Sequence, residues 1–234
     1  MVRFGDFDTR GYPTVDVRRG YGEWVDTYED TVEDAMDVEL LSSLGRVPWD
    51  ELGRAVDLGC GTGRTGAWLH GRGVERIDGV DLTPEMLAVA RSRGVYERLV
   101  EADVSATGLP GSAYDLVITS LVDEHLPEVA PLYREAWRLA RPGASEVLVA
   151  YHPHFIMTAG MPTHFTRASG EAVAIETHVH QLSEHVTAAL DAGWTLLEMR
   201  ERIIDDAWLR LKPKWERFHH HPIAVAFVWQ RGGA

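Results

Sequence analysis

The chain has 234 residues and a formal net charge of −13, so most of its surface should repel the phosphates of nucleic acids, and nucleic acid is not expected as a partner. No apolar run is long enough to span a bilayer and the first residues are too polar for a secretion signal, so no membrane partner is expected either. A single cysteine, Cys60, excludes an internal disulfide and fits a reducing cytoplasm.

The first 44 residues divide into two stretches. Residues 1–20 show no periodicity and contain several turn-forming residues, so a mobile or draped arm is expected there. From Tyr21 to Leu44, apolar residues recur at helical spacing, and the opposite face carries acidic residues with no basic residue among them. Such a face is usually just solvated, but it is also compatible with a helix that leans over a ligand.

A glycine-rich loop comes next, between an apolar strand and the start of a helix. Gly59, Gly61 and Gly63 alternate in this loop, and a backbone that turns sharply beside a ligand needs residues without a Cβ. A second short strand ends at Asp81, where a carboxylate could accept two hydrogen bonds from a ribose diol. The pattern predicts a nicotinamide or an S-adenosyl cofactor. Cys60, inside the loop, is interpreted as a small packing residue rather than a nucleophile.

Apolar strands and helices then alternate along the chain. This alternation predicts a parallel sheet with helices on both faces and a ligand at the carboxyl ends of the strands. The expected strands cover residues 54–58, 77–81, 98–101, 114–119, 146–151, 196–204 and 223–230. The expected helices run to residue 70 and cover residues 84–93, 128–139 and 182–192.

Two stretches fall outside this alternation and are expected to cap the ligand site. The first, residues 152–182, should contain a hairpin made of residues 165–167 and 172–180 around a turn. The second is residues 205–222. Aromatic and methionine side chains in both stretches suggest a mainly apolar pocket for a planar molecule, although the same residues could fill a core.

Five motifs along the chain occur in a fixed order. They are Asp57 with the glycine loop, Asp81 followed by Leu82, Asp103 followed by Val104, the strand from Tyr114 to Ser120, and Arg141-Pro142-Gly143. Together they resemble the class I S-adenosylmethionine-dependent methyltransferases over roughly residues 50–151. The resemblance implies an α/β, Rossmann-like sheet of seven strands, in which the last strand inserts antiparallel between its neighbours. It also implies S-adenosyl-L-methionine as cofactor and S-adenosyl-L-homocysteine as product.

The resemblance also implies a domain organisation. Residues 1–44 would form an N-terminal arm and lid helices, with Tyr21, Trp24 and Tyr28 over the site. Residues 45–234 would form a methyltransferase domain with cap insertions at 152–182 and 205–222.

The motif matches assign roles to individual residues. The glycines would bring backbone to the methionine moiety, Asp81 would hold the ribose, and Asp103 with the Val104 amide would read the adenine edge. Asp57 would order the loop or meet the cofactor ammonium. The alternative for Asp81 and Asp103 is turn formation at strand ends. The residues expected to bind the cofactor are Asp57, Gly59, Gly61, Gly63, Asp81, Leu82, Asp103, Val104, Ser120, Tyr21 and Tyr28.

Candidate acid–base residues follow the fourth and fifth strands. Asp123 stands where the family usually has an apolar residue, and it could orient a substrate amine, assist proton removal or cap the next helix. Glu124 and His125, beside it, are ordinary for the family. Imidazole titrates near neutral pH and suits proton removal from an acceptor, and six histidines lie in or beside the first cap. The candidates are His180 first and then His152 and His154, with plain solvated histidines as the alternative.

Metal binding is a further possibility for these histidines. His178 and His180 would share one face if they lay in a strand, and two such rings can bind a metal. No cysteine and no tight carboxylate partner supports a closed site, so no metal is expected. His219-His220-His221 is interpreted as a solvated or cap-packing tract.

The expected function is methylation of a small aromatic or heteroaromatic acceptor at carbon, nitrogen or oxygen, in the cytoplasm. The cap with its histidines resembles bacterial natural-product methyltransferases, including those that methylate indole ring carbon, where the ring N–H must lose its proton. Three alternatives stay open: a cyclisation or rearrangement on the same fold, a non-enzymatic partner subunit, and a nicotinamide dehydrogenase. The oligomeric state has no marker in the sequence.

Overall fold

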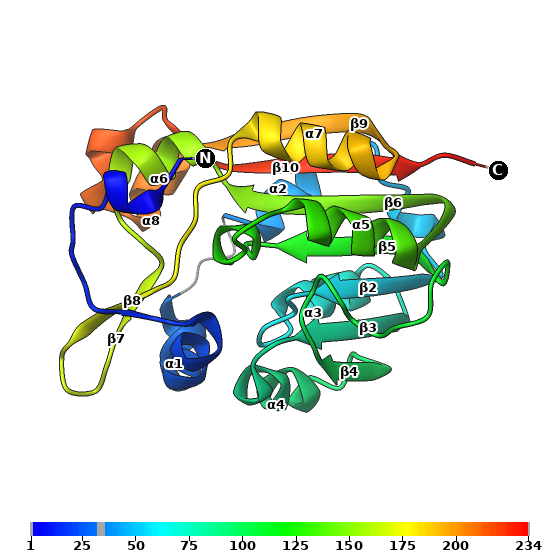
Figure 1. Cartoon of the computed structure of the whole chain (residues 1–234), viewed down its shortest axis with the longest axis horizontal. Helices are drawn as coiled ribbons and strands as arrows, with labels where there is room; N and C mark the ends of the chain where they lie inside the picture. The colour runs from blue at the N-terminus through cyan, green and yellow to red at the C-terminus, as the bar shows by residue number, and fades with distance from the viewer. Residues whose placement is uncertain (1, 32–35, 234) are drawn as a thin grey trace.

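Seven strands form one sheet in the order β4–β3–β2–β5–β6–β10–β9 (Figure 1). The computed structural model describes residues 2–31 and 36–233. The strands are β2 (Arg54–Leu58), β3 (Arg76–Asp81), β4 (Arg98–Glu101), β5 (Tyr114–Ser120), β6 (Ala140–Tyr151), β9 (Trp194–Ile203) and β10 (Pro222–Arg231). Strands β4, β3, β2, β5 and β6 are parallel to one another, and β10 is antiparallel to both β6 and β9. The expected fold class and the inserted last strand are therefore confirmed.

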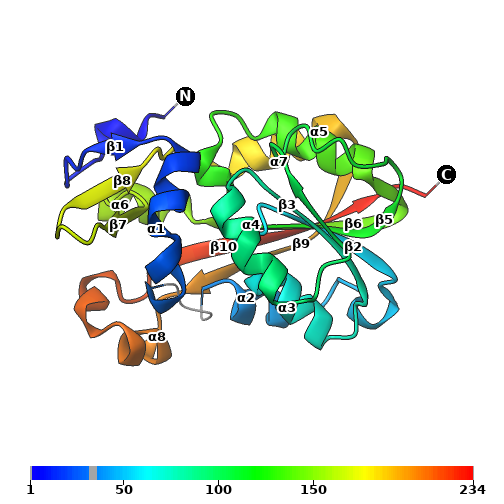
Figure 2. The same ribbon diagram turned by 90° about the horizontal axis from the view of Figure 1, so that it is seen from below.

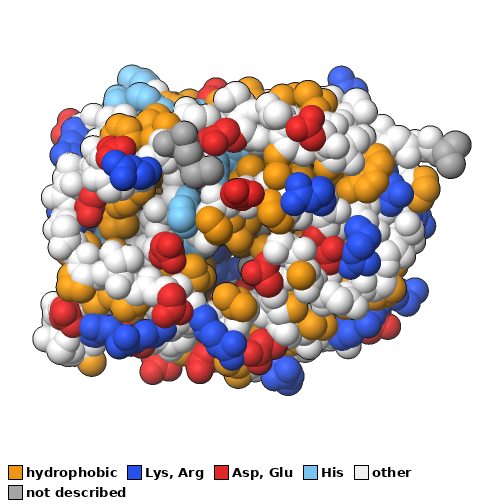
Figure 3. Space-filling view, in the orientation of Figure 1, with side chains coloured by type: hydrophobic (Ala, Val, Ile, Leu, Met, Phe, Trp, Pro, Cys, Tyr) orange, Lys and Arg blue, Asp and Glu red, His pale blue; other side chains and the backbone are white. Residues whose placement is uncertain are grey.

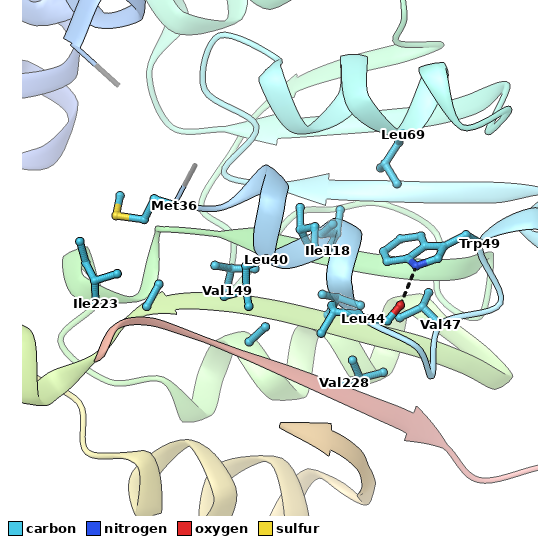
Figure 4. Close-up of a cluster of buried hydrophobic side chains, with 14 of the residues drawn as sticks. Met36, Leu40, Leu44, Val47, Trp49, Leu69, Ile118, Val149, Ile223 and Val228 are labelled. Atoms are coloured by element: carbon cyan, nitrogen blue, oxygen red, sulfur yellow. Dashed lines mark hydrogen bonds between the residues drawn. The ribbon is translucent and has the colours of Figure 1, made fainter. Parts of the chain in front are cut away.

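Helices cover both faces of this sheet because its strands are apolar on both sides. Val147 and Val149 of β6 face one core, and Leu148 and Ala150 face the other. The first core also contains residues of α2 (Val38–Ser43) and α3 (Arg64–Gly71) (Figure 4). The second contains residues of α5 (Ala130–Leu139) and α7 (Leu182–Ala192), which lie side by side over β5, β6 and β10 (Figure 1).

The element boundaries differ from expectation mainly at β6. The strand begins at Ala140 rather than at residue 146, so it includes Arg141-Pro142-Gly143. These three residues are exposed, and continuous burial begins at Ala144. The apolar pattern therefore marks only the buried part of the strand. Helix α4 (Pro84–Ser92) lies close to its expected place.

A second, smaller sheet lies beside the first, and we call it with its helix the lid. Strands β1 (Thr14–Val15), β8 (Ala172–Ile175) and β7 (His164–Thr166) form this sheet in that order. Trp24 of helix α1 (Val17–Thr31) packs on Phe165, Val173 and Ile175 of this sheet. The other side of α1 lies against α4 (Figure 2). The N-terminal arm is thus draped: η1 (Phe4–Asp6) leads into β1, which pairs parallel with β8.

The helix expected from Tyr21 to Leu44 corresponds to two helices. Helix α1 begins earlier, at Val17, and ends at Thr31, and α2 begins at Val38. The Asp37 side chain accepts a hydrogen bond from the Val38 amide at the start of α2. The part of the expected helix over residues 32–35 lies outside the described residues.

The two caps are short helices and a hairpin. The first cap contains α6 (Pro153–Ala159), β7 and β8, and the second contains α8 (Asp206–Leu211) and the 3-10 helix η4 (Pro213–Phe218). Two further 3-10 helices are η2 (Trp49–Glu51) and η3 (Asp123–His125). The hairpin is confirmed, but β8 ends at Ile175, so the expectation that His178 and His180 lie in a strand is wrong. Here the chain leaves the hairpin, and the His178 amide donates to the Glu124 carbonyl.

Two absences hold for the residues described. Among residues 2–31 and 36–233, no helix has the length and apolar character that a membrane crossing requires. Within the same ranges, no three His, Cys, Asp or Glu side chains come together as ligands for a metal ion.

Candidate active site

A cavity lies at the carboxyl ends of the parallel strands, between the sheet and helix α1. Its empty space is about 830 Å³, part of it open to solvent, which is in the range of small-molecule sites. Residues from four strand ends, from α1 and from η3 meet there. The lining residues are Val17, Tyr21, Tyr28, Gly59, Gly61, Asp81, Leu82, Thr83, Met86, Asp103, Val104, Ser120, Leu121, Val122, His125, Leu126 and Pro127.

One end of this cavity, which we call the cofactor end, is built from backbone. Gly59 has φ +73°, and a Cβ there would lie 2.3 Å from Val122 Cγ2, so only glycine fits. At Gly61, with φ +52°, a Cβ would meet nothing within 4 Å, which leaves room for a ligand against the loop. The Gly61 amide donates to Asp81 Oδ2 at 2.8 Å, and the Thr83 amide donates to Asp81 Oδ1 at 2.8 Å. The carboxylate of Asp81 thus fixes the loop and lines the cavity.

Two of the expected cofactor residues stand behind the loop rather than in the lining. Gly63 is the N-cap of α3, with φ +86°. Asp57 is buried and accepts a hydrogen bond of 2.8 Å from the Tyr96 hydroxyl. Burial, and next to it the negative charge of Asp81, raises the pKa of Asp57 to about 7, although its hydrogen bonds from Tyr96 and Gly66 oppose this. Asp57 therefore links the end of β2 to Tyr96, a partner that sequence reasoning missed.

The far side of the cofactor end comes from β4 and the start of α4. Asp103 Oδ1 accepts from the Ser105 amide at 2.7 Å and from the Ser105 hydroxyl at 2.6 Å, and Asp103 lines the cavity. Val104, Leu82 and Met86 form an apolar wall beside it. Six of the expected cofactor residues therefore meet at this end, namely Gly59, Gly61, Asp81, Leu82, Asp103 and Val104.

The opposite end, which we call the acceptor end, is built from side chains. Tyr21 and Tyr28 of α1 face Ser120 and the segment from Leu121 to Pro127. Leu121 has φ +56°, a strained value for a branched residue that is held by the bond from its amide to the Val149 carbonyl. Burial raises the pKa of Tyr28 to about 12, so its hydroxyl stays protonated.

A hydrogen-bonded chain crosses the acceptor end. His125 Nδ1 lies 2.7 Å from the Glu176 carbonyl oxygen, and His125 Nε2 lies 2.8 Å from the Tyr21 hydroxyl. A carbonyl can only accept, so Nδ1 carries the proton and Nε2 accepts from Tyr21. Burial lowers the pKa of His125 to about 4, so the ring is neutral at neutral pH. Sequence reasoning treated His125 as ordinary for its place, and its position just after β5 was the available indication.

Two of the candidate bases lie just outside the acceptor end. His180 Nε2 is 2.8 Å from the Leu126 carbonyl, so this ring braces the segment after η3. Asp123 is 3% exposed, and its Oδ2 lies 3.3 Å from His185 Nε2, which ties η3 to α7. Neither residue lines the cavity. The capping role considered for Asp123 is not what its side chain does here.

The other two candidate bases hold the first cap to the sheet. His152 Nδ1 accepts from the His154 amide at the start of α6, and His152 Nε2 lies 3.0 Å from Glu201 Oε1 on β9. His154 Nε2 lies 3.1 Å from His221 Nδ1. Neither His152 nor His154 lines the cavity.

Comparison with known proteins agrees with this geometry. Residues 56–148 match the family model described as "Methyltransferase domain". A structure of an S-adenosylmethionine-dependent methyltransferase from Mesorhizobium loti superposes with a TM-score of 0.66 at 26% identity, covering 86% of this chain and 99% of that one. Over residues 56–148 the chain is similar to methyltransferases, and its fold is that of the S-adenosylmethionine-dependent methyltransferases.

The curated relatives of this chain match over part of their length. A trans-aconitate 2-methyltransferase from Azoarcus sp. (strain BH72) is 40% identical over 101 residues, which are 43% of this chain and 40% of the relative. A malonyl-[acyl-carrier protein] O-methyltransferase from Enterobacter lignolyticus (strain SCF1) is 31% identical over 100 residues, 43% of this chain and 39% of the relative. The chain thus spans about two fifths of the length of these relatives.

The cofactor of this methyltransferase family fits the residues present. S-adenosylmethionine supplies a methyl group bound to a sulfonium sulfur. A nucleophile would attack the methyl carbon in line with the carbon–sulfur bond, and S-adenosylhomocysteine would leave. The open space at Gly61 would let the cofactor lie against the backbone of the loop. The carboxyl groups of Asp81 and Asp103 can accept hydrogen bonds from its hydroxyl and amine groups.

Proposed function

We propose that this chain transfers the methyl group of S-adenosylmethionine to a small aromatic or heteroaromatic acceptor, at carbon, nitrogen or oxygen. The observation that carries the proposal is a single cavity with a backbone-built end and an aromatic end. Gly59, Gly61 and Asp81 form the first, and Tyr21 and Tyr28 line the second. Methyl transfer needs mainly alignment of two reactants and exclusion of water, and a covered cavity with two such ends supplies both.

The residues divide by role in this proposal. Gly59, Gly61, Asp81, Leu82, Asp103 and Val104 contact the cofactor, Asp57 and Gly63 shape the loop, and Ser120, Tyr21 and Tyr28 lie where cofactor and acceptor meet. His180 and Asp123 brace η3 and the segment after it, and His152 and His154 hold the first cap in place. At the acceptor end, Tyr21 and His125 are hydrogen-bonded to each other and can take part in proton transfer.

The acceptor setting is proposed from the walls of the cavity. The two curated relatives are named for their acceptors, trans-aconitate and malonyl-[acyl-carrier protein]. The aromatic walls of this cavity suit planar natural-product rings, indoles among them. The single buried Cys60 fits a cytoplasmic setting.

The test has two stages. Calorimetry first measures binding of S-adenosylhomocysteine, which should bind. Incubation with methyl-labelled cofactor and a panel of indoles, phenols, aromatic amines and trans-aconitate then locates the label by mass spectrometry. Label on an aromatic acceptor supports the proposal. Tight cofactor binding with no labelled product from any acceptor would point to a non-enzymatic subunit.

A second function has one observation in its favour. The [4+2]-cyclase SpnF superposes with a TM-score of 0.67, covering 96% of this chain and 100% of that one, at 16% identity. This likeness shows the fold alone, and one fold can host a cyclisation without methyl transfer. The release of S-adenosylhomocysteine in the presence of acceptor separates the two functions, since a cyclase would release none.

A further inference from the structure

The acceptor end lacks the group that a carboxylate acceptor would need. Among the lining residues that the structure describes, none is Lys or Arg, and the two that carry carboxyl groups are Asp81 and Asp103. Within η3, Glu124 is 2% exposed, and its Oε2 has no hydrogen-bond partner among the described residues. Arg64, on the sheet side, lies 3.0 Å from Asp37 and is not part of the lining.

The lack of basic side chains is a property of the cavity lining and not of the outer surface. Figure 3 shows acidic and basic side chains interspersed over the face seen there, so an anion approaching that face meets no single-sign barrier. Inside the cavity, an anionic acceptor would lose its hydration without gaining a cationic side chain of the protein, which is costly.

The same end contains a group for which a carboxylate acceptor has no use. Carboxylic acids have already lost their proton at neutral pH, whereas a phenol, an amine or an indole N–H must lose one when it is methylated. The Tyr21 hydroxyl donates to His125 Nε2 and keeps two lone pairs on its oxygen that can accept from a ligand. Both side chains line the cavity.

We infer that the acceptor presents an uncharged N–H or phenolic O–H, and that its proton leaves through Tyr21 to His125 Nε2. The inference rests on the proposed function and names its acceptor class. The acceptor atom bonds to the methyl carbon as the carbon–sulfur bond breaks, and that electron pair stays on sulfur. The acceptor proton passes to the Tyr21 oxygen while the Tyr21 proton passes to His125 Nε2.

Two neighbours position His125 for this transfer. The Glu176 carbonyl holds Nδ1, so the imidazole keeps the tautomer with a free lone pair on Nε2. Glu124 Oε1 lies 3.8 Å from Nε2. Burial, and next to it the charge of Asp123, raises the pKa of Glu124, so this carboxyl neighbours the ring without a settled negative charge.

Binding of matched probes tests the acceptor class without turnover. 4-Nitrophenol and 4-nitrobenzoate share a ring and differ in the ionising group, and at mildly acidic pH the first is neutral. With S-adenosylhomocysteine present, calorimetry should show 4-nitrophenol binding at least ~10-fold more tightly, the worth of about one hydrogen bond. Tyr21→Phe, which keeps the ring against Trp24, should remove most of that preference and leave S-adenosylhomocysteine affinity unchanged. Tyr12→Phe, outside the cavity lining, is the matched control.

Turnover tests the proton path. His125→Asn keeps an amide N–H near the Nδ1 position for Glu176 and removes the Nε2 acceptor. It should lower kcat about 100-fold with the cofactor affinity preserved, the scale of a lost general base. His70→Gln, on the surface of α3, should leave kcat unchanged.

Several results would overturn the inference. Equal or tighter binding of 4-nitrobenzoate, binding of neither probe, methylation of trans-aconitate, or unchanged kcat in His125→Asn would each do so. The binding results and an unchanged kcat leave cofactor binding and methyl transfer to an aromatic acceptor standing, whereas methylation of trans-aconitate alone would also contradict the aromatic acceptor of the proposed function. Failure of S-adenosylhomocysteine to bind at all would sink both.

Discussion

The two ends of the cavity are built by different means. At the cofactor end, the loop around Gly59 and Gly61 is tied to the neighbouring strand by a hydrogen bond from the Gly61 amide to the Asp81 carboxylate. At the acceptor end, Tyr21 and His125 meet across 104 positions of sequence, and His125 reaches Glu176 across 51. The first end is a property of one supersecondary unit, whereas the second exists only when the lid has folded onto the sheet.

This difference has a thermodynamic consequence. The loop is anchored by the large sheet core, but the lid has a small core of its own, made of Trp24, Phe165, Val173 and Ile175. Regions with few buried apolar contacts open at lower free energy than the global unfolding. The acceptor end should therefore be lost before the cofactor end, and variants of each region can test this.

The largest effect is expected at the cofactor end. In Gly59→Val, the added Cβ would lie 2.3 Å from Val122 Cγ2 at a positive φ that valine rarely adopts. S-adenosylhomocysteine affinity, measured by calorimetry, should fall by about 100-fold or more, since the loop must move to relieve the contact. Gly73→Ala, with φ +93° but open space around its Cβ, is the control. It should cost about 1 kcal/mol of stability and leave affinity unchanged. Wild-type affinity in Gly59→Val would contradict the geometry.

The next effect belongs to the acceptor end. Trp24 stacks on Phe165 with ring centroids 5.8 Å apart, and Trp24→Ala should destabilise the lid by about 3–5 kcal/mol. Hydrogen exchange should then quicken in α1, β7 and β8, and turnover should fall about 10-fold or more, while the unfolding midpoint of the sheet changes little. Trp229→Ala, in the core of the sheet, should instead lower the unfolding midpoint of the sheet and leave hydrogen exchange in the lid little changed. Loss of protection throughout the sheet in Trp24→Ala would show that the two regions are one cooperative unit.

A smaller effect comes from Asp57. Burial raises its pKa from 3.8 to about 7, so the folded chain keeps a proton that the unfolded chain has released between these pH values. The free energy of unfolding therefore falls as pH rises from about 4 to about 7, by at most about 4 kcal/mol. Asp57→Asn cannot titrate and should lose this decline, as urea unfolding at about pH 4.5 and about pH 7.5 would show. An identical decline in the variant would assign it to other groups.

The smallest effect is expected at Cys60. Its thiol is buried, and burial raises its pKa, so it is protonated at neutral pH and a poor nucleophile. Cys60→Ala should keep turnover within about twofold and cost about 1 kcal/mol of stability. A thiol-directed reagent should leave the native wild-type chain active. Loss of turnover in the variant would give Cys60 a chemical role.

The cofactor end could be predicted from the sequence because its geometry is local. Glycines at alternate positions report where a Cβ is excluded, and Asp81 follows a strand that the apolar pattern already predicts. The inserted position of β10 did not follow from the pattern of apolar residues and came from resemblance to a family.

The acceptor end could not be predicted in the same way. The sequence favours His180 because it lies just before a helix, and then His152 and His154 because they follow the fifth strand. The folded chain uses those rings for a backbone carbonyl, a carboxylate and another imidazole. His125 reaches the cavity because η3 follows β5 directly, and Tyr21 reaches it because a two-residue strand, β1, docks the arm. A strand of two residues leaves too little periodicity to detect.

The parallel pairing of β1 with β8 also sets the order in which this molecule can be completed. Thr14 leaves the ribosome long before Ala174, the residue beside which it finally lies. During that interval the nascent chain carries Trp24 without Phe165, so its aromatic stripe stays exposed to chaperones and to neighbouring chains. The lid over the cavity is therefore assembled late in biosynthesis, because β1 and α1 must wait for β7 and β8 to be synthesised.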